Sequence, residues 1–356
     1  MNKNLVQKLL EAAVMAPSGD NVQPWDIQVS ENFTQIDLYN LPDKDRSYYN
    51  YQQSASYIAH GALIENMLIA AKQLGCQLEY QLFPNKEDDN YIAKISLSSA
   101  EAQPEPLYAA IFERCTNRFL YKRTEVSSEV LQALEDSVKD IDSAKVSLVN
   151  QKDKVKQLAK ELMVNDRIVF ECKEIHQFLF DKIRWNKKQI EETRDGMPVD
   201  TLGLSFIEKL AFPMLRFWWY VRAANIFGLS KIVGLKCWWG CCNSSILGMV
   251  TIKGNDKIAF IEGGRASQRL WLEASNQGFA LQPIIGLPLL INRLKQNQLD
   301  GFLDKHKTFV SRAAESLPGL FGLNKDDTLI MGFRAGSVSG QGKIVRTLRK
   351  NDFKGL

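Results

Sequence analysis

A polar loop near the N-terminus carries the first residues whose types suggest chemistry. It reads "APSGDNVQPW" over residues 16–25, and most of these residue types are ordinary in turns. Ser18, Gly19, Asn21 and Gln23 also offer a hydroxyl, accessible backbone N–H groups and two amides, which suit a flat polar ligand. The composition therefore fits both a structural turn and a ligand-binding loop.

A second motif, "ERCTNR", is rich in arginine. Arg114, Thr116 and Arg118 alternate along it, so in an extended segment they would point to one side. Two guanidiniums beside a hydroxyl suit a phosphate or another anion, although a solvated strand edge fits the pattern equally well. The tail "GKIVRTLRK" contributes Arg346 and Arg349, which could bind the same anion.

Hydrophobic periodicity predicts that these motifs lie at the ends of regular elements. A helix over 3–16 precedes the first loop, and strands over 25–29 and 35–39 follow it. The motif "LQPIIG" ends another predicted strand in a tight loop of Pro283, Ile284, Ile285 and Gly286. The other expected helices cover 54–75, 152–182, 205–227 and 257–278, and the other expected strands cover 77–83, 91–97, 145–149, 246–252 and 328–333.

The two long apolar helices invite a direct comparison. When Gly61 is aligned with Gly264, Ile58 matches Ile261 and Gly75 matches Gly278. Each helix is followed at once by a strand, which favours two related α+β halves packed together. Two unrelated apolar helices that end in glycine could share the same matches.

Together these motifs resemble the FMN-dependent nitroreductase family, whose usual loop after the first helix is Pro-Ser-x-x-Asn-x-Gln-Pro-Trp. The segment "RCTNRF" is similar to that family's Arg-x-Ser-x-Arg segment. The resemblance implies an α+β fold of the double-length, fused branch. Two related units, each with a central antiparallel sheet flanked by helices, would form an intramolecular pseudo-dimer from residues 1–108 and 109–356, with an insertion or lid over 184–243.

The resemblance also assigns one FMN to a crevice between the two units. Arg114, with Arg346 and Arg349, would hold its phosphate. Thr116, which stands where the family has Ser, would lie beside the ring, and Arg118 would lie near ring atoms N1 and O2. A fixed cation at that position stabilises reduced flavin.

The remaining assignments place the loops around the ring. Pro17, Ser18 and Gly19 would cover it from the first unit, with Asn21 and Gln23 close by. The backbone of the loop over 283–286 would reach the N5 edge. Because the flavin carries the reaction, no nucleophile of the chain is required, and His60 is expected to be a packed core residue.

Two activities are consistent with this site. One is an oxidoreductase that uses NADH or NADPH to reduce nitroaromatics, quinones or enones. The other is an FMN-sequestering protein whose lid is closed and which turns over little or not at all. The segment 184–243 could be that lid, with Gly196 and Gly203 as hinges, or a helical arm that only braces the units.

Composition narrows the other classes of function. The chain has 356 residues, 45% hydrophobic content and a net charge of only +4, which argues against a nucleic-acid partner. Six cysteines do not make a disulfide scaffold at this length, and the first helix does not read as a signal peptide, so we expect a cytoplasmic protein. Cys237, Cys241 and Cys242 lack the second ligand pair of a zinc site, so no metal is expected.

The stretch over 212–229, "FPMLRFWWYVRAANIFGL", is the most aromatic part of the chain. Arg216 and Arg222 interrupt it, and no run reaches the length of a membrane span, so no integral span is predicted. A buried or lid helix and an interfacial helix that binds a membrane surface both remain open. The expected partner is a small molecule, and the expected state is a monomer with an internal pseudo-dimer, or a loose homodimer.

Overall fold

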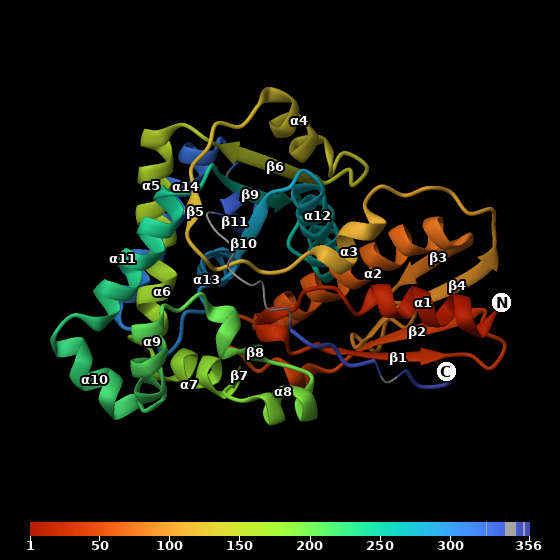
Figure 1. The fold of residues 1–356 in the computed structure, drawn as a ribbon, viewed down its shortest axis with the longest axis horizontal. Coiled ribbons are helices and arrows are strands. Elements are labelled where there is room, and N and C mark those ends of the chain that lie inside the picture. The colour runs from red at the N-terminus through yellow and green to blue at the C-terminus, as the bar shows by residue number, and fades with distance from the viewer. Residues whose placement is uncertain (325, 339–346, 352) are drawn as a thin grey trace.

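The computed structural model describes residues 1–324, 326–338, 347–351 and 353–356, and its architecture is α+β. Its first antiparallel sheet has the strand order β1-β2-β4-β3. These strands are β1 (Trp25–Val29), β2 (Gln35–Asn40), β3 (Cys76–Leu82) and β4 (Tyr91–Ser99), and Figure 1 shows them together at one end of the molecule. The predicted strands of this region are confirmed to within a few residues.

The second sheet has the order β10-β11-β9-β6, and β5 pairs with β11 outside that path. Its strands are β5 (Tyr121–Lys122), β6 (Ala144–Val149), β9 (Ile246–Ile252), β10 (Ala280–Ile284) and β11 (Thr328–Val338). Strands β7 (Ile183–Arg184) and β8 (Met197–Pro198) form a separate parallel pair.

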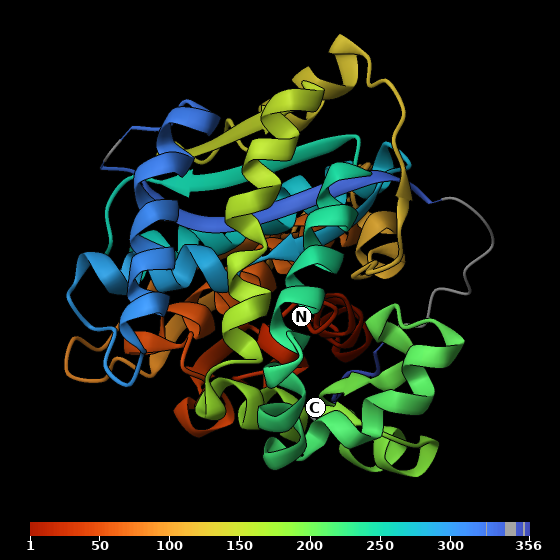
Figure 2. The ribbon, with the colours of Figure 1, turned by 90° about the vertical axis from the view of Figure 1, so that its left-hand side faces the viewer.

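Strand β9 is buried along its whole length because both faces of the second sheet are covered. Ile246 and Val250 point into one core, which the second sheet shares with the first sheet. Leu247 and Met249 point into the other core, beneath helices on the opposite face. Figure 2 shows α5 (Lys152–Leu162) and α14 (Asp304–Phe321) in front of this sheet.

The N-terminal helix α1 (Lys3–Ala13) forms because apolar residues recur on one of its faces. Val6, Leu9 and Leu10 on that face are fully buried. Helix α2 (Ser54–Leu74) is buried on most of its surface and ends at Gly75, whose φ of 74° suits glycine in a C-cap. The Asn66 side chain of α2 donates to the Ala12 carbonyl over 3.0 Å, which fixes α1 on α2.

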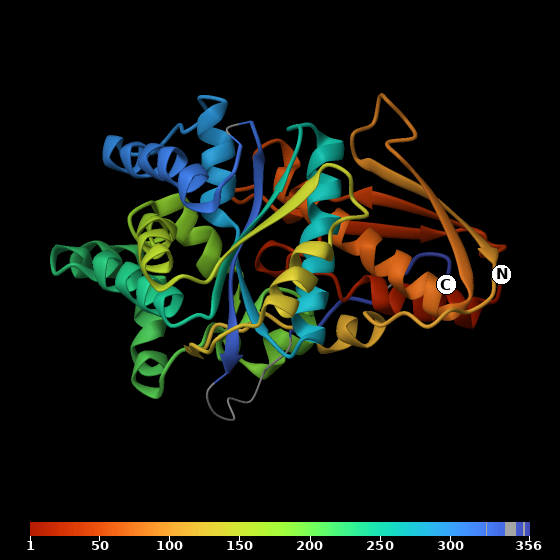
Figure 3. The ribbon, with the colours of Figure 1, turned by 90° about the horizontal axis from the view of Figure 1, so that it is seen from above.

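Helices α2 and α12 (Lys257–Asn276) cross between the two sheets, as Figure 3 shows. Their backbones touch at two glycines. A Cβ atom at Gly61 would lie 1.9 Å from the Ile261 carbonyl oxygen, and a Cβ atom at Gly264 would lie 2.1 Å from the Ile58 carbonyl oxygen. The contact is therefore reciprocal between the residues that the sequence comparison aligns.

The expectation of one helix over 205–227 is wrong. The structure has α9 (Phe206–Ala211), a 3₁₀ segment over Phe212–Arg216 and α10 (Trp218–Ile226). Pro213 lacks an N–H and its ring disfavours a continuous helix, and Gly228, at a φ of 87°, separates α10 from α11 (Leu229–Cys242). Helix α11 contains all three cysteines of the CWWGCC motif.

The remaining helices connect the two sheets and cover the second one. They are α3 (Tyr108–Glu113), α4 (Ser128–Asp136), α6 (Val164–Val169), α7 (Lys173–Asp181), α8 (Lys187–Thr193) and α13 (Gly286–Lys295). The predicted helical region over 152–182 is confirmed as three helices, α5 to α7. Within the described ranges, no helix combines the length and the apolar character needed to cross a membrane.

The end of the chain returns to the first sheet. The Val29 amide donates to the Lys354 carbonyl over 2.9 Å, and the Lys354 amide donates to the Ile27 carbonyl over 3.3 Å. The Lys354 ammonium also pairs with Asp26 at 2.8 Å. The last residues therefore extend the edge of the first sheet at β1, although Lys354 and its partner Asp26 are 328 residues apart in the sequence.

Candidate functional site

One cavity lies where the first loop meets the arginine-rich segment. Its walls come from four separate parts of the chain and include seven of the predicted site residues: Pro17, Ser18, Asn21, Arg114, Thr116, Arg118 and Arg349. Its free volume is about 70 Å³, whereas small-molecule sites usually have at least roughly 300 Å³. A ligand as large as a flavin would therefore require a wall segment to move.

The first loop has an unusual backbone. After α1, Gly19–Asn21 form a single 3₁₀ turn, and Asp20, Asn21 and Gln23 have φ values of 45°, 57° and 53°. Asn and Asp tolerate this left-handed region better than other residues with a Cβ atom, and such strain is often held at functional sites. The Ser18 hydroxyl accepts a hydrogen bond from the backbone N–H of Gln23 over 3.0 Å, which closes the loop.

Arg114 ends helix α3 and reaches into the interior between the two sheets. Only 4% of the residue is exposed, so a solvated strand edge is the wrong interpretation for Arg114. Its Nη2 donates to the Met15 carbonyl over 2.7 Å, and its guanidinium lies 4.4 Å from the centre of the Trp271 ring. Arg114 therefore connects the end of α1 to α12 while it lines the cavity.

Thr116 and Arg118 follow in an extended segment beside β10. Thr116 forms a parallel bridge with Leu281, and the Asn117 amide donates to the Leu281 carbonyl over 3.1 Å. Arg118 Nη1 donates to the Thr201 carbonyl over 3.2 Å. Because the segment is extended, Arg114, Thr116 and Arg118 all face the same cavity, as their alternation predicts.

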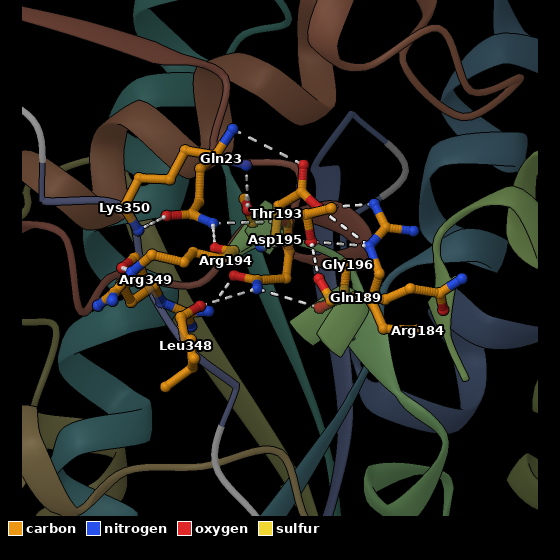
Figure 4. Close-up of polar contacts among 12 residues, drawn as sticks. Gln23, Arg184, Gln189, Thr193, Arg194, Asp195, Gly196, Leu348, Arg349 and Lys350 are labelled. Atoms are coloured by element: carbon orange, nitrogen blue, oxygen red, sulfur yellow. Dashed lines mark hydrogen bonds and ion pairs between the residues drawn. The ribbon is translucent and has the colours of Figure 1, made fainter. Parts of the chain in front are cut away.

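Gln23 connects the first loop to two distant segments, as Figure 4 shows. Its Nε2 donates to the Arg194 carbonyl over 2.8 Å, and its Oε1 accepts from the Lys350 amide over 2.8 Å. Gln23 is buried, and neither Gln23 nor Gly19 is among the described residues that line the cavity. The amide of Gln23 thus holds the surrounding segments together.

Asn21 makes a parallel set of contacts on the cavity side. Its Nδ2 donates to the Gly196 carbonyl over 3.1 Å and to the Leu348 carbonyl over 3.2 Å. Its Oδ1 accepts from the Arg349 guanidinium. Asn21 and Gln23 therefore bind both the 194–196 loop and the C-terminal tail over 347–350 against the first loop.

The 194–196 loop is itself fixed by an ion pair. Arg184 Nη2 lies 2.6 Å from Asp195 Oδ1, and both side chains are largely buried. Gly196 has a φ of 69°, and a Cβ atom there would lie 2.4 Å from the Lys182 carbonyl oxygen, so only glycine fits. This loop leads into β8 and places Met197 and Thr201 in the cavity wall.

No residue of the predicted loop over 283–286 is among the described residues that line the cavity. Pro283 and Ile284 belong to β10, where they pair with Phe333 and Gly332 of β11. Ile285 precedes α13, and a Cβ atom at Gly286 would lie 2.3 Å from Asn165 Oδ1. Their assignment to the edge of a flavin stays a prediction, and Arg346 lies outside the described residues.

The electrostatics of the cavity favour an anion. Burial, followed by the positive charge of Arg114, lowers the pKa of Arg349 to about 9. Burial also lowers the pKa of Arg118, against the opposing effect of Asp20. Three guanidiniums thus share a partly desolvated space, in which a bound anion would stabilise their charged forms.

Asp20 is the acidic group of this cavity. Burial, followed by the negative charge of Asp45, raises its pKa to about 6. Sequence reasoning missed Asp20 as a site residue, together with Met15, Cys115, Met197, Thr201 and Thr347. The signal for Asp20 was its place inside the first loop, and for Met197 and Thr201 it was the glycine-bounded loop "RDGMPVDTLGL".

Two other chemical groups lie outside the cavity. His60 is fully buried and its Nε2 lies 3.2 Å from Asn40 Oδ1. Burial lowers its pKa to about 3, so it is a neutral core residue as expected. All six cysteines are free, and in the described part of the chain no group of three or more His, Cys, Asp or Glu residues is arranged to hold a metal ion.

Sequence comparison gives distant relatives. No family model matches the chain. An uncharacterized protein of Mycobacterium tuberculosis is 24% identical over 306 residues, which cover 82% of this chain and 40% of that protein. A second M. tuberculosis protein, whose name assigns it provisionally to the NAD(P)H nitroreductases, is 29% identical over 118 residues, 33% of this chain and 34% of that protein. The chain thus spans well under half the length of the curated relatives that it matches.

Comparison with solved structures gives similarly distant matches. The FMN-dependent nitroreductase NfnB of Mycobacterium smegmatis, in complex with NADPH, has 14% identity and a TM-score of 0.38, over 69% of this chain and 94% of that one. A nitroreductase with bound FMN from Bacteroides fragilis has 14% identity and a TM-score of 0.33, over 67% and 90%. Scores of this size do not define a fold, so the architecture rests on its own strand order and contacts.

Proposed function

We propose that this protein is an FMN-binding oxidoreductase of the nitroreductase type, which uses NADH or NADPH to reduce small electrophiles such as nitroaromatics, quinones or enones. The observation that carries the proposal is the convergence of Arg114, Arg118 and Arg349 on one cavity beside the Ser18–Asn21 loop. The provisional nitroreductase name of one relative and the FMN-bound and NADPH-bound states of the matched structures agree with it.

Phosphate recognition is assigned to Arg114 and Arg349. Their charges lie close enough that Arg114 lowers the pKa of Arg349. A phosphate bound between them would offset this repulsion between the two positive charges. Arg349 is also fixed by the Asn21 amide and by the Thr347 hydroxyl at 2.6 Å. A guanidinium fixed in this way suits the bidentate recognition of a phosphate.

The ring is assigned to the rest of the cavity, with Pro17, Ser18 and Thr116 against it and Arg118 at its polar edge. When bound, FMN accepts reducing equivalents from the nicotinamide coenzyme and passes them to the acceptor. Arg118, which is oriented by the Thr201 carbonyl, supplies a fixed positive charge in a partly desolvated space. The cavity walls position the reactants and exclude water.

The proposal includes two related units, residues 1–108 and 109–356, that enclose one FMN per chain. The reciprocal contacts of Gly61 and Gly264 support it, because a two-fold interface pairs each contact with its mirror partner. One flavin per chain follows because the Pro-Ser-x-x-Asn-x-Gln-Pro-Trp loop occurs once in the sequence. Six free cysteines agree with a reducing, cytoplasmic location.

A second candidate function is FMN sequestration without rapid turnover. It is favoured by the small free volume of the cavity and by the two segments that Asn21 and Gln23 hold across it. If the 194–201 loop and the tail close over a bound flavin, a coenzyme cannot reach the ring. The insertion over 184–243 would then act as a lid.

Stopped-flow mixing distinguishes the two functions. The protein is reconstituted with FMN, freed of excess flavin and mixed with NADPH or NADH under argon. Rapid bleaching of the flavin absorbance, faster than that of free FMN, supports the oxidoreductase. Tight FMN binding with bleaching no faster than that of free FMN supports sequestration. Failure to bind FMN contradicts both functions.

A further inference from the structure

An apolar lobe, defined here as residues 206–242, extends from the molecule beside the cavity. It comprises α9, the segment over 212–216, α10 and α11, and Figure 1 shows α10 at the left-hand extreme, farthest from the first sheet. Large apolar side chains at its surface are strongly exposed: Phe227 87%, Ile226 82%, and Phe206 and Ile207 78% each. Exposed large apolar side chains gathered on one lobe are typical of an interaction surface.

The inner side of the lobe is firmly packed. Val221 is fully buried, and the Ser230 hydroxyl donates to Glu171 Oε1 over 2.7 Å. On α11, a Cβ atom at Gly234 would lie 2.6 Å from the Arg167 side chain, so this face fits closely against α6. Because the inner faces of α10 and α11 are fixed in this way, the apolar side chains on their outer faces remain exposed.

On α11 the outward residues follow helical spacing. Ile232, Leu235 and Trp239 are all exposed, and their separations of three and four residues place them on one face. On α10 and its end, Trp219, Ile226 and Phe227 are exposed in the same way. Trp and Phe combined with aliphatic residues on a helix surface are typical of helices that lie in the interface of a lipid bilayer.

The charge of the lobe points to an anionic partner. It contains five basic residues and one acidic residue, Glu208. Lys209 pairs with Asp200 at 2.6 Å, and Lys236 pairs with Glu208 at 2.5 Å. The other three, Arg216, Arg222 and Lys231, are exposed and take part in no ion pair among the described residues. Unpaired basic residues around an apolar surface are attracted to anionic lipid headgroups.

We propose that this lobe docks the protein onto the surface of an anionic lipid bilayer. The helices of the lobe have 6, 9 and 14 residues, fewer than the roughly 20 that a membrane span requires, so the lobe would insert its apolar side chains only to the depth of the headgroups. A second copy of the chain is disfavoured as the occupant, because a two-fold contact would bring the basic residues of both lobes together. The inference does not depend on flavin binding.

The test is co-sedimentation of the full chain with lipid vesicles, at low salt and then at roughly physiological salt. One set of vesicles is pure phosphatidylcholine, and the other contains about one third phosphatidylglycerol. The charge variant combines Arg216→Gln, Arg222→Gln and Lys231→Gln. Its matched control combines Lys3→Gln, Lys8→Gln and Lys86→Gln, exposed residues outside the lobe that change the net charge equally. A third variant combines Trp219→Ser, Ile226→Ser and Phe227→Ser.

The proposal predicts salt-sensitive binding to the anionic vesicles and much weaker binding to the neutral ones. The charge variant should bind roughly a hundredfold more weakly, the apolar variant should also lose binding, and the control should bind like the unmodified chain. Equal binding by the charge variant and its control would overturn the proposal. So would the absence of vesicle binding together with a dimer in sedimentation velocity that the apolar variant abolishes, since this assigns the lobe to self-association.

Discussion

Gly61 and Gly264 each allow the other's helix to approach. A Cβ atom on Gly61 would lie 1.9 Å from the carbonyl oxygen of Ile261, and one on Gly264 would lie 2.1 Å from that of Ile58. Below this crossing, Glu65 of α2 pairs with Arg265 at 3.0 Å and with Arg269 at 2.6 Å. The two helices between the sheets are thus joined by direct backbone contact and by a buried carboxylate with two cationic partners.

Gly61→Ala should therefore destabilise the protein severely, by more than about 4 kcal/mol, because the new methyl group meets backbone atoms that cannot rotate away. The matched control is Gly319→Ala in α14, where a Cβ atom meets nothing within 4 Å. That change should be neutral or stabilise by roughly 0.5–1 kcal/mol. Urea unfolding measures both, and equal stabilities of the two variants would contradict the close helix crossing.

Arg349→Gln should separate phosphate recognition from ring recognition. If Arg349 binds the phosphate, the variant loses a charge-assisted hydrogen bond and binds FMN about ten- to a hundredfold more weakly. Its affinity for riboflavin, which has no phosphate, should not change. Arg46→Gln on the surface is the control. Fluorescence titration provides the affinities, and an equal loss for both ligands would argue against a phosphate contact.

Gln23→Asn tests whether the first loop holds the C-terminal tail. Asn tolerates the left-handed φ of this position, but its amide is one methylene too short to reach both Arg194 and Lys350. The Lys350 amide, which donates to Gln23, should exchange its hydrogen roughly two- to tenfold faster, since one net hydrogen bond is lost. Hydrogen exchange read by mass spectrometry measures this rate, with Gln7→Asn on α1 as the control. Unchanged exchange would show that the tail is held by other contacts.

Asp20→Asn should change how stability depends on pH. The folded-state pKa of Asp20 is about 6, above its ordinary value of 3.8. The native state therefore binds this proton more tightly, and stability falls as pH rises from about 4 to about 6. The variant should lack this fall and should be more stable at pH 7.5 by up to about 3 kcal/mol.

The pH prediction is checked by urea unfolding near pH 4 and at pH 7.5. The gain should shrink to roughly 0.5 kcal/mol near pH 4, where the native state holds the proton and the unfolded state, with its ordinary pKa of 3.8, holds it less than half of the time. Glu31→Gln, at an exposed position in a loop, is the control and should behave like the unmodified chain. A gain from Asp20→Asn of the same size at both pH values would rule out titration of Asp20 as its cause.

Sequence reasoning recovers most of the strands because local patterns determine them, whereas the family resemblance is what implied that the first loop and the arginine-rich segment lie together. The alternation of Arg114, Thr116 and Arg118 predicts a shared face, and the structure places all three on one cavity. The hydrogen bonds by which Asn21 and Gln23 hold distant segments could not be predicted, because their partners Gly196 and Arg194 lie more than 170 residues away in the chain. Such long-range hydrogen bonds leave no local periodicity.

Pro213 is a visible reason for a break in the helix predicted over 205–227. The prediction nevertheless gave more weight to the apolar content of the segment than to this proline. The same apolar content indicated a buried or lid helix, whereas Phe206, Ile226 and Phe227 are exposed. Composition alone cannot tell a buried apolar helix from one that faces outward, because burial depends on which elements pack against it. The hydrogen bond from Arg118 to the Thr201 carbonyl likewise could not be predicted, because the two residues are 83 positions apart in the sequence.

The central claim is that FMN binds between the first loop and the arginine-rich segment, with its phosphate at Arg114. The most direct measurement is a crystal structure of the full chain reconstituted with FMN. If FMN binds there, the crystal structure will contain one flavin per chain, with the phosphate in hydrogen-bond contact with Arg114 and the ring between Ser18 and Thr116. A flavin bound elsewhere, or two flavins per chain, would contradict it.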